Sequence, residues 1–131
     1  MLPDQRDAAH LWSMVKPARY LANKAPAITL QELRTSEETQ YAIAKALELV
    51  GEGARRLSEP FRAAHPEVPW AVVRGMRNIL VHEYDRVDWP IVWKAITIDV
   101  PELLRHLESL LPDVPPEESA DNPLETTPPN A

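Results

Sequence analysis

An amphipathic stripe between Glu37 and Ser58 constrains the fold more than any other feature of this 131-residue sequence. Five apolar residues recur at i, i+4, i+7, i+11 and i+14, which is the spacing of one helical face. They are Ile43, Leu47, Val50, Ala54 and Leu57. Charged side chains take the other faces of the segment. The stripe therefore predicts a long helix with one side packed against other helices.

Two glycines, Gly51 and Gly53, lie inside this stripe. A glycine in a helix costs about 1 kcal/mol relative to alanine, so two of them need a compensating reason. We expect that the missing side chains let another helix approach closely, which is a packing role and not a ligand-binding role. Pro60 then ends the segment, because proline cannot continue a helix.

Further segments with apolar residues at helical spacing are separated by prolines along the chain. We expect one helix over 4–23, kinked or divided at Pro17, because proline lacks the backbone N–H that a helix interior needs. Others are expected over 70–82, from Trp89 onward, and after Pro101, where the proline interrupts the pattern. The last helix should bury five leucines: Leu103, Leu104, Leu107, Leu110 and Leu111. With only three glycines and few alternating apolar runs, the chain is predicted to be an all-α bundle of four or five helices.

Composition divides the chain near Pro112. Residues 112–131 contain six prolines, several acids and no lysine or arginine. Such a segment buries too little apolar surface to offset the entropy lost on ordering. We therefore expect a helical domain at 1–111 followed by a flexible, proline-rich, acidic tail.

Charge and composition also restrict the class of protein. A net charge of −6 argues against tight, non-specific binding of nucleic acid, although the uneven spread of acids leaves room for a local basic cleft. The chain has no cysteine, so disulfides and thiolate sites are excluded. It has no apolar run of membrane-spanning length and no signal peptide at its start. We expect a cytoplasmic protein without membrane association.

The segment Arg74–Tyr84 brings a cation, an amide, an imidazole and a phenol into an otherwise helical pattern. In a helix over 70–82, one broad face is apolar and should face the core. This face consists of Val72, Val73, Met76, Ile79 and Leu80. Arg74, Asn78 and His82 follow one another on the opposite side.

Arg77 and His82 are five residues apart, about 140° around a helix axis. A site that uses both side chains needs an arginine that bends across, or a second copy of the helix. A two-fold homodimer supplies that second copy at low geometric cost.

The chemistry of these side chains suits a phosphate ester. Arginine binds phosphate through two parallel hydrogen bonds and stabilises charge that builds on phosphorus. His82 can exchange protons near neutral pH, and Asn78 can orient the imidazole or hold a phosphate oxygen. These are the parts for metal-independent cleavage of RNA with the 2′-hydroxyl as nucleophile. The four histidines are scattered without metal-ligand spacing, so no metal and no cofactor is expected. The same residues also fit a solvated helical face that ends in a capping histidine.

Three stretches together resemble the HepT-like toxins of the HEPN domain superfamily. They are 69–88, with its Arg-x4-His-x-Tyr pattern, then 91–94 and 99–103. Upstream, 40–58 is similar to a helix of the same family. The resemblance covers roughly residues 5–111 and leaves the tail uncovered.

The resemblance implies an all-helical homodimer that acts as a metal-independent RNA endonuclease, the toxin of a type VII HEPN/MNT toxin–antitoxin pair. By position, Arg77 and His82 would be catalytic, and Asn78 and Arg74 would support phosphate binding. Tyr84 would be the residue to which the cognate antitoxin, a minimal nucleotidyltransferase (MNT), attaches AMP. The alternatives are a non-catalytic module that binds a nucleotide or docks a nucleotidyltransferase, and a purely structural helical dimer.

Overall fold

The computed structural model describes residues 4–81 and 87–112, and within these ranges the chain is helical without any β-strand. The elements in chain order are α1 (Gln5–Lys24), the 3₁₀ turn η1 (Ala25–Ala27), α2 (Leu30–Thr35), α3 (Glu37–Arg56), α4 (Glu59–Ala64), α5 (Trp70–Gly75), α6 (Asn78–Val81), α7 (Trp89–Lys94), the π-helical segment η2 (Ala95–Asp99) and α8 (Val100–Leu110). The predicted all-α bundle is confirmed. The predicted flexible tail lies outside the described residues, apart from Pro112. No helix in the described ranges is both long and apolar enough to cross a membrane.

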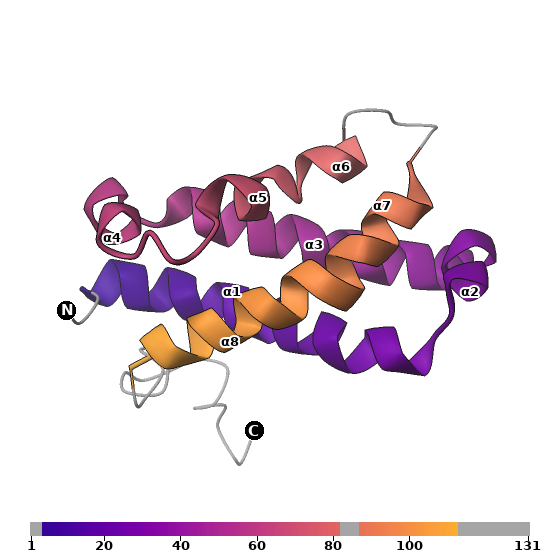
Figure 1. Cartoon of the computed structure of the whole chain (residues 1–131), viewed down its shortest axis with the longest axis horizontal. Coiled ribbons are helices and arrows are strands. Elements are labelled where there is room, and N and C mark those ends of the chain that lie inside the picture. The colour runs from indigo at the N-terminus through magenta and orange to yellow at the C-terminus, as the bar shows by residue number, and fades with distance from the viewer. Residues whose placement is uncertain (1–3, 82–86, 113–131) are drawn as a thin grey trace, which may run out of the picture.

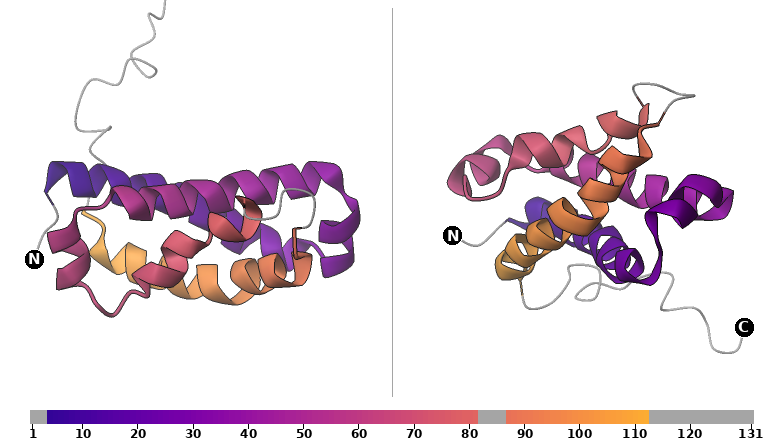
Figure 2. Two further views of the ribbon diagram at one scale, coloured as in Figure 1. Left: turned by 90° about the horizontal axis from the view of Figure 1, so that it is seen from above. Right: turned by 45° about the vertical axis from the view of Figure 1, so that its right-hand side comes forward.

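Two long antiparallel helices, α1 and α3, form the centre of the bundle (Figure 1). The segment from α7 through η2 to α8 crosses them, and α5 lies along α3 (Figure 2). Side-chain caps start both central helices: Asp4 accepts a hydrogen bond from the Asp7 N–H, and Ser36 accepts one from the Thr39 N–H. The other elements are thus arranged around this central pair.

The apolar stripe of α3 faces the core as predicted. Its five residues are at most 2% exposed. Gly53 lies directly against α1, where a Cβ atom would collide with Cγ of Met14, a fully buried side chain. The close approach expected at this glycine is therefore confirmed.

Helix α1 is not divided at Pro17, so that alternative was wrong. The proline ring removes one backbone hydrogen bond, but side chains on both sides of it are fully buried, among them Met14 and Leu21. Tertiary packing of the apolar face, more than local propensity, stabilises helices in folded proteins. Burial against the rest of the bundle explains why the helix continues through the proline.

Pro101 does not interrupt the last helical stretch either. The chain passes from α7 through η2 into α8, and Pro101 lies in the first turn of α8. A proline in a regular α-helix clashes with the carbonyl four residues earlier, here that of Thr97. The wider π-helical turn at η2 relieves such crowding. Of the five leucines predicted to be buried, Leu103 and Leu107 are buried and the other three are only half-buried.

The helix predicted over 70–82 is interrupted. Helix α5 ends at Gly75, a turn follows, and α6 begins at Asn78. Around the turn the backbone bonds tighten to i→i−3 spacing, from Met76 N–H to the Val73 oxygen and from Leu80 N–H to the Arg77 oxygen. Val73 and Met76 are buried, and Ile79 and Leu80 are half-buried. Val72 is 52% exposed, so its assignment to the core was wrong.

Trp70 fixes the start of α5 against α4. Its indole N–H donates to the backbone oxygens of Arg62 and His65, at 3.1 and 2.9 Å. Trp70, Trp89 and Trp93 are half-buried and pack against the core. These tryptophans are therefore packing anchors, and Trp70 sets the direction in which α5 leaves the α4–α5 connection.

Candidate functional site

A cavity of about 420 Å³ opens between α3 and the α5–α6 segment. It is lined by Gly51, Arg55, Ala71, Arg74, Gly75, Arg77 and Asn78. The first two come from α3, and the others come from α5, from the turn after it and from the start of α6. Three of the five residues singled out in the sequence therefore share one cavity.

Those three side chains, Arg74, Arg77 and Asn78, are all exposed and lie away from the buried Val73 and Met76. The turn between α5 and α6 carries Arg77, which lines the same cavity as the other two. The remaining two predicted site residues, His82 and Tyr84, lie outside the described residues. In the sequence His82 follows directly after Val81, the last residue of α6.

Gly51 allows Arg77 to lie close to α3. A Cβ atom at Gly51 would be 3.2 Å from both the Cβ and the backbone nitrogen of Arg77, and 3.4 Å from the Val73 oxygen. This confirms the close approach predicted for the glycine pair. It also gives Gly51 a role that the sequence did not reveal, since the residue sets how near the arginine-bearing turn comes to α3.

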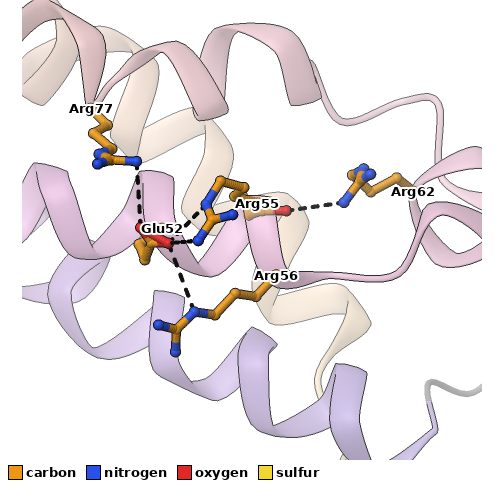
Figure 3. A network of polar contacts seen from close by, with 6 residues as sticks. Glu52, Arg55, Arg56, Arg62 and Arg77 are labelled. Atoms are coloured by element: carbon orange, nitrogen blue, oxygen red, sulfur yellow. Dashed lines mark hydrogen bonds and ion pairs between the residues drawn. The ribbon is translucent and has the colours of Figure 1, made fainter.

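The carboxylate of Glu52 forms ion pairs with three arginines (Figure 3). Its Oε1 atom accepts a hydrogen bond from Arg55 Nε at 2.8 Å and another from Nη2 of the same side chain, and it lies 3.8 Å from Arg56 Nε. Its Oε2 atom lies 3.7 Å from Arg77 Nη1. The hydrogen bond from Arg55, followed by the positive charges of Arg55, Arg77 and Arg56, holds the pKa of Glu52 below its ordinary value. The carboxylate therefore stays charged at neutral pH and keeps its arginine partners.

The cavity is basic although the whole chain carries a net charge of −6. Three of its lining residues are arginines, and no carboxylate lines it among the residues the structure describes. Guanidinium groups with free N–H donors bind phosphate in this kind of setting. Across residues 4–81 and 87–112, no three His, Cys, Asp or Glu side chains gather closely enough to hold a metal ion. The arrangement suits recognition of phosphate groups.

Arg55 and Glu52 were missed as site residues. On the helical pattern of α3 they belong to the solvated faces, and only the packing of α5 onto α3 places them beside Arg77. The signal available in the sequence was the cluster of charges that directly follows Gly51.

Sequence comparisons place the chain that forms this cavity in a known family. The family model described as Ribonuclease HepT-like matches residues 16–110, which include every residue that lines the cavity. A protein of Thermococcus cleftensis named probable ribonuclease HepT is 37% identical over 101 residues, covering 70% of this chain and 92% of the relative. A provisionally named RNase of Methanocaldococcus jannaschii is 33% identical over 100 residues, covering 76% of this chain and 92% of the relative. No solved structure shows a significant match. The chain belongs to the ribonuclease HepT-like family.

Proposed function

We propose that this protein is a metal-independent RNA endonuclease that binds the RNA backbone in the cavity between α3 and α5–α6. The observation that carries the proposal is the convergence of Arg74, Arg77 and Asn78 on one basic cavity; Asn78 precedes His82 by four residues in the chain. Membership of the ribonuclease HepT-like family and the names of the relatives support it.

In the proposed reaction Arg77 binds the scissile phosphate and stabilises the negative charge that develops on its oxygens. Arg74 and Asn78 hold further phosphate oxygens. His82 removes the proton from the 2′-hydroxyl, whose oxygen bonds to phosphorus while the bond from phosphorus to the 5′-oxygen breaks. The leaving 5′-oxygen takes a proton from a second acid. The products are a 2′,3′-cyclic phosphate and a 5′-hydroxyl.

A homodimer supplies that second acid, since two copies of His82 then serve one composite site. An apolar groove beside the cavity supports the proposal. Val72 and Ile91 are 52% and 49% exposed and line this groove, and Gly75 lines both the groove and the cavity. A second copy that covers these apolar side chains would therefore lie next to the basic cavity.

The reaction predicts two results with purified protein and a defined RNA. Cleavage continues in excess EDTA, and one product carries a 5′-hydroxyl. A matched oligonucleotide with a single 2′-deoxy nucleotide at the scissile position is not cut there, because the nucleophile is missing. Gel analysis before and after phosphatase and kinase treatment identifies the ends. EDTA-sensitive cleavage that leaves 5′-phosphates contradicts this mechanism, and a protein that binds a nucleotidyltransferase stably but never cuts RNA matches the docking module instead.

The proposed biological role is that of the toxin in a type VII toxin–antitoxin pair, with Tyr84 as its off-switch. AMP on Tyr84 would add a phosphate and an adenosine two residues from His82, which would occupy the phosphate site and offset its positive charge. Incubation with the partner nucleotidyltransferase and ATP should yield AMP on the Tyr84 peptide by mass spectrometry and end RNA cleavage. Tyr84→Phe should stay unmodified and active in the same mixture. Modification of another residue, or inhibition of Tyr84→Phe to the same degree, contradicts this role.

A further inference from the structure

Helix α3 contributes an arginine to the cavity from outside the Arg-x4-His-x-Tyr segment. Arg55 lines the cavity together with Arg74 and Arg77, although it lies on a different helix. Its side chain is 58% exposed, so its guanidinium is accessible to a bound molecule. An extended RNA chain carries one phosphate per nucleotide, so a strand held at Arg77 presents further phosphates to the neighbouring parts of the cavity.

Arg56, the next residue on α3, carries the same charge as Arg55 but differs from it in position relative to the cavity. Arg56 is equally exposed, at 60%, and pairs with the same Glu52 carboxylate. Arg56 lies 3.8 Å from that carboxylate and does not line the cavity, whereas Arg55 hydrogen-bonds to it through two nitrogens. The pair therefore provides a matched comparison on one helix.

Glu52 links the two sides of the cavity. One of its oxygens holds Arg55 of α3 and the other faces Arg77 of the turn after α5 (Figure 3). A guanidinium has five N–H donors, so each arginine keeps donors for a phosphate while it contacts the carboxylate. Holding two long side chains in place before binding removes an entropy cost that RNA binding would otherwise carry. Glu52 itself is only 24% exposed and does not line the cavity.

We propose that Arg55 binds a backbone phosphate of the RNA next to the phosphate at Arg77, and that Glu52 positions both guanidinium groups for these contacts. The proposal deepens the function proposed above and rests on it. Arg55 here is a binding residue, and Glu52 is a positioning residue that acts through the two arginines.

The first experiment measures binding of a single-stranded RNA made uncleavable by 2′-deoxy substitution. For Arg55→Ala we expect about tenfold weaker binding near 0.1 M salt, and a shallower dependence of log K on log salt by about 0.7 for the one lost phosphate contact. Arg56→Ala removes the same charge from the same helix and should change affinity by less than about threefold. Equal losses in both variants, or no loss in Arg55→Ala, overturn the assignment of Arg55. Thermal unfolding of each variant shows whether the fold is retained.

The second experiment measures kcat and KM for Glu52→Gln. If Glu52 positions the arginines, kcat falls about tenfold through Arg77 and KM rises through Arg55, because the amide is a weaker partner for two cations. If Glu52 is merely a negative charge that repels RNA, its removal lowers KM and leaves kcat unchanged or higher. Glu48→Gln is the matched control one turn earlier, where the carboxylate is 49% exposed and lies 3.6 Å from Lys45 Nζ. A wild-type kcat in Glu52→Gln overturns the positioning role.

Failure of this inference can be told apart from failure of the proposed function. If the wild-type protein cuts RNA and Arg77→Ala does not, but Arg55→Ala behaves like Arg56→Ala, only the assignment of Arg55 is wrong. If the wild-type protein cuts no RNA, the proposed function is wrong, and the binding experiment still tests Arg55 as a phosphate ligand.

Discussion

Replacing Arg77 or His82 by alanine is expected to lower kcat for RNA cleavage by about 10²–10⁴-fold, the largest change predicted for this protein. In the proposed reaction, Arg77→Ala removes the cation that would face the developing charge on phosphorus, and His82→Ala removes the proton acceptor. Arg77 is 47% exposed, and its ion pair with Glu52 at 3.7 Å is a surface contact. Such pairs contribute little to stability, so the arginine variant should fold normally.

Single-turnover cleavage of a defined RNA measures this loss. Expression in cells without the partner tests the proposed toxin role, since the wild-type protein should arrest growth and the two variants should not. Arg105→Ala is a suitable control, because this arginine is exposed on α8 and does not line the cavity. Wild-type cleavage rates in both Arg77→Ala and His82→Ala, with cleavage retained in the control, would place the catalytic groups elsewhere.

The second large effect concerns stability. Leu47→Ala is expected to lower the free energy of unfolding by about 2–5 kcal/mol, because it removes a fully buried side chain and leaves a cavity. Leu47 lies in the core-facing stripe of α3, the helix with the most extensive contact to α1. Urea unfolding followed by circular dichroism measures the change, and the slope of the transition should stay the same.

Leu49→Ala is the matched control, with the same substitution two residues later on the same helix. Leu49 is 42% exposed, so the free energy of unfolding should change by less than about 0.5 kcal/mol. A loss in Leu49→Ala as large as that in Leu47→Ala would mean that the outer face of α3 is buried in solution, for example by a second copy of the chain.

The helical architecture could be predicted because it depends on local periodicity. The stripe of α3 and its two glycines lie within one stretch of the sequence. The prolines were predicted less well. Pro17 and Pro101 both lie inside continuous helical stretches, since burial of the flanking side chains at Pro17 and a π-helical turn before Pro101 offset what each proline removes.

The motif residues of the candidate site were also visible in the sequence. Arg74, Arg77 and Asn78 line one cavity, and the chain belongs to the family that their pattern indicated. Their arrangement was not visible, because the helix over 70–82 breaks into two pieces at a turn whose distance from α3 is set by Gly51. The helical pattern of α3 places Arg55 and Glu52 on its solvated faces and gives no sign that they lie beside the cavity.

By itself, then, the sequence determined the all-α class, the central helix and the segment whose residues Arg74, Arg77 and Asn78 line the cavity. Helix formation and amphipathic spacing are local properties, and a window of roughly 11–18 residues shows them. Only the tertiary structure decided that α5 packs onto α3, and so only it placed Arg55 and Glu52 beside Arg77. The basic cavity of this acidic protein arises where segments distant in sequence meet, which local periodicity cannot specify.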